Sequence, residues 1–389
     1  MRSRTSNSVL HKLPPSSKRL VVLVLSSLLC LAAVLLPTSG LLLSKAQGLS
    51  DVQTGSKTVE LAPDAKTEGM EVNVGIQLKN IYDLNLASQS FLAEGWYWLS
   101  WNDEVQAVLE SLKIEPTQMI EFPNEIEVGQ FSVNEVLPEE VKVKSGTPHS
   151  LYVKFSGKFY IDEVAQRLAP FDPQRLKLAL EVKLSSLTEG PNQINLVPIS
   201  IEQLPIAGEF SSVNGFILTD TEWTRQMANY IEPLAGKNQT RSREIVRYSR
   251  ATAILTYSPD PVTVFLKWLL PLIAVMGIVI LSPSIDGTLG DVRLAIPSAA
   301  LLTLVVLHDG YKENFPPAPY LTYLDEIYTY SYIACFVIFL LFLVGTNTHS
   351  RGSEQEREAI SNKINRLDLI VQVSMISGFV IVASVGWFS

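Results

Sequence analysis

The last third of this 389-residue chain carries four long apolar segments, which constrain its fold more than any other feature. Each approaches the roughly 20 residues that a helix needs to cross a bilayer, although the second does so only with its flanks. We therefore predict a transmembrane domain over 262–389, with spans at about 262–282, 291–313, 323–345 and 366–388.

The second segment is the least apolar of the four and has acids at both ends. On a helix of about 3.6 residues per turn, seven of its residues share one face. They are Asp291, Ala295, Ala299, Leu302, Val306, Asp309 and Glu313, and we call them the pore stripe. An unpaired carboxylate in hydrocarbon is costly, so this face is poorly suited to lipid. It suits water, because acids at both mouths of a pore concentrate cations.

We predict that the pore stripe lines an aqueous path, with Leu302 and Val306 as a gate that closes by dewetting. The alternative is a packing helix whose small residues allow close contact with its neighbours. Burial of the stripe against helices of the same subunit would exclude the pore.

Three further residues of this segment bear on the prediction. Arg293 lies about 160° around the helix from Ala295, so we place it off the pore and predict a preference for cations. Pro297 removes a backbone hydrogen bond inside the helix and is expected to bend its inner end. His308, next to Asp309, is either an interfacial histidine in water or a group that makes the protein sensitive to pH.

The chain before the four spans divides into three parts. Residues 1–46 have a basic start and an apolar run, as in a signal peptide or signal anchor, and 47–70 form a polar linker. In 71–261, β-branched and aromatic residues at alternate positions predict strands of an antiparallel sandwich. The clearest strand patterns are at 71–84, 90–101, 150–161, 175–184 and 243–257. We assign the aromatic residues Trp96, Tyr97, Trp98 and Trp101 to the sandwich core.

Composition argues against other classes of protein. A formal net charge of -8 gives no support to nucleic-acid binding, which favours a basic surface. Cys30 and Cys335 both lie in apolar runs, so no disulfide framework is available to the strands. We find no metal-spaced His/Cys set, no phosphate-binding glycine loop and no Ser/His/Asp arrangement. We therefore expect no catalytic residues, no metal and no cofactor.

Loop charges predict the orientation of the spans. The 346–366 linker contains Arg351, Arg357, Lys363 and Arg366, whereas the 308–326 loop is mainly acidic. The positive-inside rule then places the linker in the cytoplasm and both the sandwich and the C-terminus outside.

Several local motifs resemble those of one family. The strand patterns MEVNVGIQL and LSWNDE come first, and APFDPQRL at 169–176 contains a Pro-Phe-Asp-x-Gln motif. Pro271 lies in the first span, and FPPAPYLTYLD at 315–325 precedes the third. In this order, from about residue 70 to the end, they resemble the pentameric ligand-gated ion channels, the Cys-loop receptor superfamily.

The resemblance implies an immunoglobulin-like extracellular sandwich, a four-helix transmembrane domain and a homopentamer in a lipid membrane. A small extracellular agonist would bind between subunits and open a path for monovalent cations. The candidate agonist residues are Trp223, Tyr230 and Tyr248. Coupling to the pore would join Pro170, Phe171 and Asp172 of the sandwich to Pro316, Pro319 and Tyr320 before the third span.

Two departures from the family pattern are informative. The cysteines that animal members place around the Pro-Phe-Asp motif are absent, with Leu176 where the second would be. This and the short 346–366 linker resemble the prokaryotic branch, so we expect a bacterial inner membrane. The arginine that often precedes the first span is not at its usual place, and Arg250 could replace it only in a longer strand.

A second function class stays open. The same elements would suit a membrane-anchored β-sandwich that binds or senses a ligand without conducting ions. Counting the subunits and recording from the purified protein in bilayers would separate the two, because a monomer or dimer cannot enclose the predicted pore.

Overall fold

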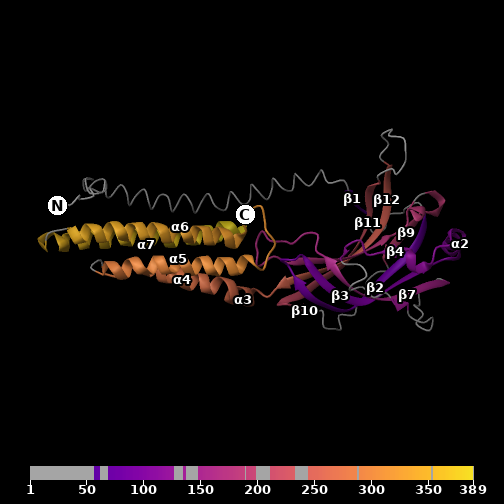
Figure 1. The fold of residues 1–389 in the computed structure, drawn as a ribbon, viewed down its shortest axis with the longest axis horizontal. Helices are drawn as coiled ribbons and strands as arrows, with labels where there is room; N and C mark the ends of the chain where they lie inside the picture. The colour runs from indigo at the N-terminus through magenta and orange to yellow at the C-terminus, as the bar shows by residue number, and fades with distance from the viewer. Residues whose placement is uncertain are drawn as a thin grey trace, which may run out of the picture.

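A computed structural model gives the fold of the chain (Figure 1). It describes residues 57–61, 69–126, 135–136, 148–188, 190–198, 211–232, 244–286, 289–351 and 354–388. In these residues a β-rich region, which we call the β domain, is followed by four helices long and apolar enough to cross a membrane. The helices run along the long axis of the molecule, and the β domain lies at one end of them. The predicted signal segment, 1–46, lies outside the described residues.

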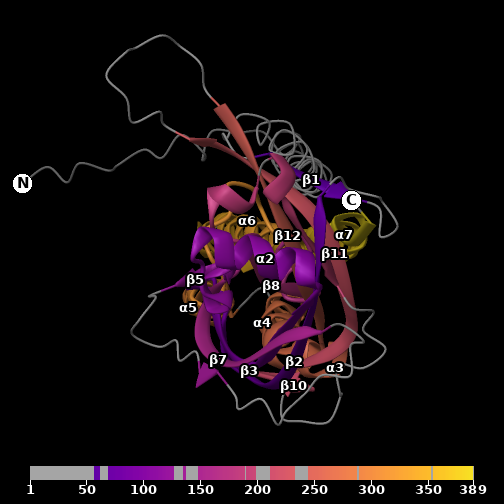
Figure 2. The ribbon, with the colours of Figure 1, turned by 90° about the vertical axis from the view of Figure 1, so that its right-hand side faces the viewer.

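Two sheets form the β domain, and Figure 2 looks onto them with the helices behind. The first has the order β1 (Lys57–Leu61), β11 (Phe216–Glu232), β12 (Glu244–Pro259), β8 (Gln174–Val182) and β4 (Ile120–Glu121), with β10 (Ser212–Val213) beside β11. The second has the order β5 (Glu125–Ile126), β7 (His149–Tyr160), β3 (Ser90–Trp101), β2 (Met70–Asn85) and β9 (Ile194–Pro198), with β6 (Glu135–Val136) beside β7. The described strands pair antiparallel except β2 with β9.

The two sheets share one hydrophobic core, because alternate residues of their strands point inward. In β3 the inward positions include Tyr97 and Trp101, which are buried. Trp96 and Trp98 point to the opposite face and are only partly buried, and Trp98 stacks on Tyr152 there. The assignment of the whole aromatic run to the core is therefore wrong for these two tryptophans.

The helical elements after the β domain match the four predicted spans. The first span joins α3 (Pro261–Val264), a π-helical stretch (Phe265–Leu269), α4 (Leu270–Leu281) and a 3₁₀ turn (Ser282–Ser284). The others lie in α5 (Gly290–Lys312), α6 (Tyr323–Arg351) and α7 (Glu354–Phe388). Pro297 lies inside α5, which continues through it.

Some elements of the β domain are not among the predicted ones. The predicted linker 47–70 contains β1, which pairs with the unpredicted strand β11. A helix, α2 (Asp103–Leu112), follows β3, and 3₁₀ turns occupy Pro116–Gln118, Ser185–Leu187 and Gly190–Asn192. The predicted strands at 71–84, 90–101, 150–161, 175–184 and 243–257 correspond to β2, β3, β7, β8 and β12.

Candidate pore helix and its junction with the β domain

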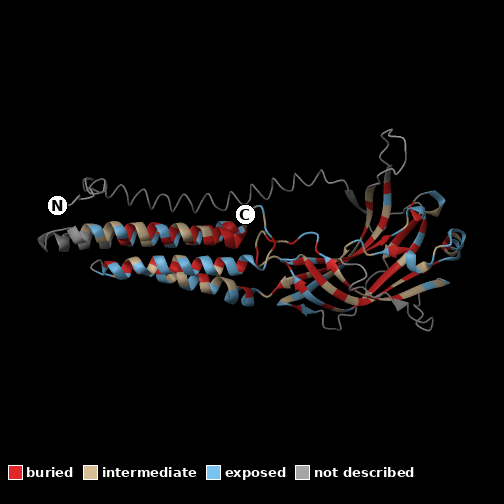
Figure 3. Cartoon of the chain, viewed as in Figure 1, coloured by how far each residue is buried: buried red, intermediate tan, exposed pale blue. Residues whose placement is uncertain are grey.

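The pore stripe lies on the surface of the chain. All seven of its residues are exposed, and the large apolar side chains of Leu302 and Val306 are 68% and 64% exposed. Exposed and buried residues alternate along α5 with the period of the helix (Figure 3). The buried face, which meets α4 and α6, consists of Gly290, Arg293, Pro297, Ala300, Leu304, His308 and Tyr311. Packing within the subunit therefore does not account for the stripe.

The N-terminal end of α5 is fixed by close contact with α6. Gly290 is buried so near Thr346 that a Cβ at this position would lie 2.6 Å from the Thr346 side chain. Arg293 points into the subunit, as its place on the helix predicts, and its guanidinium contacts Asp368 of α7 and the ring of Phe342.

Replacing Gly290 with alanine should destabilise the protein by about 1–3 kcal/mol, because the added methyl group overlaps Thr346. The midpoint of thermal unfolding in detergent measures this. Gly310 is the matched control on the same helix, since nothing lies within 4 Å of its Cβ position and alanine there should be neutral or stabilising. Removing the Thr346 side chain in the G290A protein should restore stability; if it does not, this packing is not the cause.

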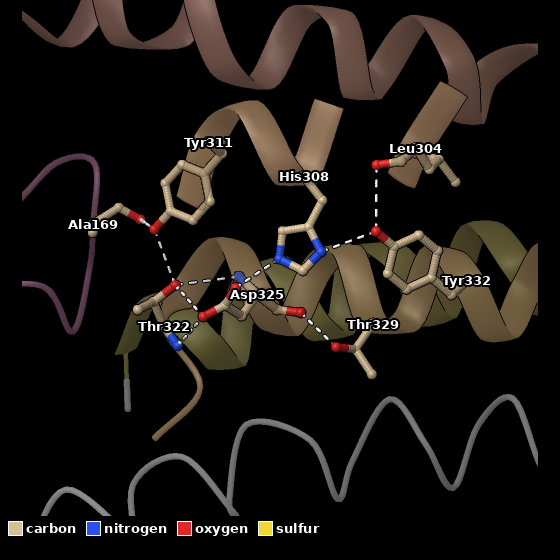
Figure 4. A network of polar contacts seen from close by, with 8 residues as sticks. All are labelled: Ala169, Leu304, His308, Tyr311, Thr322, Asp325, Thr329 and Tyr332. Carbon is tan, nitrogen blue, oxygen red and sulfur yellow. Dashed lines mark hydrogen bonds and ion pairs between the residues drawn. The ribbon is translucent and has the colours of Figure 1, made fainter. Parts of the chain in front are cut away.

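The C-terminal half of α5 is held by a buried polar network (Figure 4). His308 Nε2 lies 2.7 Å from Asp325 Oδ1, and His308 Nδ1 lies 2.9 Å from the hydroxyl of Tyr332. The imidazole also stacks on Tyr328, with the ring centroids 4.5 Å apart. His308 is thus buried between α5 and α6, and the prediction of an interfacial histidine in water is wrong.

The same network reaches the β domain through Thr322. Thr322 and Asp325 form a reciprocal cap at the start of α6: Thr322 N donates to Asp325 Oδ2 at 3.0 Å, and Asp325 N donates to Thr322 Oγ1 at 3.3 Å. The Tyr311 hydroxyl lies 3.0 Å from Thr322 Oγ1 and 3.4 Å from the carbonyl oxygen of Ala169. One set of contacts therefore connects α5, α6 and the loop before β8.

A second set of contacts ties this loop to α6 and α7. The buried carboxylate of Glu326 pairs with Arg167 at 3.3 Å, and Tyr323 N donates to the Arg167 carbonyl at 2.9 Å. Phe171 packs edge-on against Tyr323 and Trp387, with centroid distances of 6.3 and 5.2 Å. The β domain is therefore attached to the first turn of α6 and the last turn of α7.

The predicted coupling residues fall into two groups: one joins the contacts with α6 and α7, and the other lies at the 316–320 segment. Phe171 meets α6 and α7, whereas Asp172 lies near Tyr320: burial raises the pKa of Tyr320, and the charge of Asp172 raises it further. Burial also raises the pKa of Asp172, although the hydrogen bond that it accepts from Leu168 N acts to lower that pKa. Pro170 follows a cis peptide bond and is buried, Pro316 is buried, and Pro319 is exposed.

The predicted agonist residues lie on two faces of one sheet. Tyr230 and Tyr248 meet edge-to-face at 5.4 Å, and Arg250 donates to the Tyr230 hydroxyl at 2.6 Å and to Glu181 at 2.7 Å. Burial raises the pKa of Glu181, opposed by the charge of Arg250. Trp223 points to the other face, where it packs against the core. The structure thus brings the two tyrosines together and adds a partly buried ion pair that the strand pattern does not reveal.

Arg250 does not take the place of the arginine expected before the first span. It lies in the middle of β12, and the strand continues to Pro259. At about 3.3 Å per residue, this places it roughly 30 Å from Pro259, where the strand ends before that span. Its partner is Glu181 within the sheet.

Neither similarity to known proteins nor metal chemistry gives independent evidence of the function of this chain. Comparison with protein-family models and with curated proteins finds no match. In the part of the chain that the structure describes, no three His, Cys, Asp or Glu side chains gather closely enough to hold a metal ion. The function must therefore be inferred from α5, its network and the junction.

Proposed function

We propose that this chain is the subunit of a homopentameric ligand-gated ion channel of the Cys-loop receptor superfamily. The observation that carries the proposal is the exposure of the entire pore stripe on α5. The arrangement of a β domain followed by four apolar helices is compatible with a channel of this kind. The β domain would be immunoglobulin-like and lie outside the cytoplasm, and the four helices would lie in a bacterial inner membrane.

The stripe has three conceivable surroundings: its own subunit, lipid, or a space shared with other subunits. The first is excluded, because the buried face of α5 is the opposite one. Lipid is unfavourable because Asp291, Asp309 and Glu313 would carry unpaired carboxylates into or beside hydrocarbon. Turned toward a common axis, the same acids would lie at the two mouths of an aqueous path, and Leu302 and Val306 would narrow it.

The remaining parts would supply agonist binding and coupling. Tyr230 and Tyr248 stand next to Arg250 and Glu181 near the end of the β11–β12 pair, where an agonist could be held against a neighbouring subunit. Movement of the β domain would then reach α6 through the Arg167 contacts and α5 through Tyr311.

Purified protein reconstituted in bilayers tests the proposal directly. We expect a pentamer by native mass spectrometry, and single-channel currents evoked by one of a panel of amines, carboxylates, divalent ions and protons. A monomer or dimer, or a pentamer that binds a ligand but never conducts, would instead support the non-conducting anchored sensor.

Replacing Asp291 with asparagine should weaken cation selectivity, because the ring of carboxylates at the inner mouth would lose its charge. We expect unitary cation conductance to fall by on the order of threefold, and the reversal potential in a salt gradient to move toward that of chloride. Glu104→Gln, an exposed acid on α2, is the control and should leave both quantities unchanged. A wild-type reversal potential that follows chloride would refute the cation preference itself.

A further inference from the structure

An ion pair that the pore stripe does not explain joins Arg293 of α5 to Asp368 of α7. The Arg293 guanidinium donates to Asp368 Oδ2 at 2.5 Å, and both side chains are only 4% exposed. On its other side the guanidinium carbon lies 4.2 Å from the ring centroid of Phe342 in α6. Three helices therefore enclose one cation.

This pair determines which charge the inner end of α5 presents. The basic residues of α5 are Arg293 and Lys312, and Lys312 lies at the far end of the helix. Asp291, two residues from Arg293, is exposed. Because Arg293 is both buried and neutralised, Asp291 is the ionised group that α5 exposes there.

Asp368 is what allows Arg293 to remain inside. A guanidinium is strongly disfavoured in an apolar interior unless a carboxylate pairs with it. Its long side chain can instead extend to reach water. Without the carboxylate, Arg293 should therefore leave the space beside Phe342 and turn its charge toward the water at the inner end of the helices, where Asp291 lies.

We propose that Asp368 is a positioning residue for ion selectivity: by holding Arg293 inside the subunit, it keeps the inner mouth of the pore negative. The inference rests on the proposed channel function and assigns a role to a residue that lies on α7, outside the pore stripe. Asp368 acts through Arg293 and does not itself face the ions.

The test is the ratio of sodium to chloride permeability in D368N channels. We expect that ratio to fall at least about fivefold, because the freed Arg293 offsets the field of Asp291. Asp368→Glu keeps the pair and should keep the wild-type ratio. The double variant R293M/D368N removes the cation as well, and it should also select cations as the wild type does.

The double variant separates positioning from a direct effect of the Asp368 charge. If R293M/D368N loses selectivity, then Asp368 acts without Arg293 and the inference is wrong. The result for the double variant decides the question even if the single variant D368N fails to assemble. An unchanged permeability ratio in assembled D368N would overturn the inference as well.

Arginine-specific labelling with phenylglyoxal gives a readout that does not depend on current. In purified wild-type protein we expect Arg293 to be protected, and in D368N we expect it to react at least about tenfold faster, since its guanidinium has moved to water. Arg247, which is exposed on β12, should react equally in both. Equal protection of Arg293 in both proteins would contradict the inference.

The two proposals fail in different ways. A wild-type protein that gives no current overturns the channel and this inference with it. A wild-type cation channel whose D368N variant keeps both its selectivity and its protected Arg293 overturns the inference alone.

Discussion

Replacing Leu302 with serine should produce a channel that conducts without agonist. Leu302 lies near the middle of α5 and is 68% exposed, so five copies facing a common axis would form an apolar ring. Such a constriction closes by excluding water, and a hydroxyl group would allow it to hydrate. We expect cation leak into liposomes, in the absence of any ligand, to rise by on the order of tenfold or more.

Val380→Ser is the matched control for this experiment. Val380 is also apolar and 56% exposed, but it lies on α7, away from the pore stripe. Its replacement should leave the leak close to that of the wild type. Equal leak in the two variants, or a tightly closed L302S channel, would show that Leu302 is not at the gate.

The spans and the pore stripe follow from local sequence patterns. Bilayer thickness fixes the length of an apolar helix, so composition alone places all four spans to within a few residues. The stripe follows from the helical period, because residues three and four apart share a face. The exposure of Leu302 and the burial of Arg293 agree with that projection.

The β domain shows where local patterns are insufficient. The strand β11 contains the run TDTEWTRQ, which lacks a clear apolar alternation, and its pairing with β12 fixes it along nearly its whole length. Partners that are distant in sequence therefore decide its conformation. The helix α2 did have a local signal: Asn102 accepts a hydrogen bond from Val105 N at 3.1 Å, and acids occupy the first turn.

The contacts of His308 could not be derived from its own segment. Its position on α5 predicts a face, but the partners Asp325 and Tyr332 are 17 and 24 residues away on another helix. Which residues meet depends on how far one helix is displaced along its axis relative to the other, and the helical period does not determine that displacement. The capping pair Thr322 and Asp325 is different, because its spacing is a recognised helix start.

Replacing Asp325 with alanine should destabilise the protein by about 3–5 kcal/mol, since one substitution leaves two buried groups without their acceptor. His308 would lose the carboxylate at 2.7 Å, and Thr322 would lose the acceptor of its amide and hydroxyl. The midpoint of thermal unfolding in detergent, converted with the unfolding enthalpy, measures the change. Asp309→Ala removes an exposed acid beside His308 and should cost less than about 0.5 kcal/mol.

Two further variants divide this loss between the histidine and the helix cap. Thr322→Val removes the hydroxyl of the cap but leaves the His308 contact, whereas His308→Ala does the reverse. In a double-mutant cycle, H308A and D325A should be coupled by at least about 1 kcal/mol, because the side chains are in direct contact. Additive effects would mean that Asp325 serves only to begin α6. Strong coupling would mean that one carboxylate both begins α6 and anchors the C-terminal half of α5, so that α6 cannot shift at this end without moving the helix that carries Leu302.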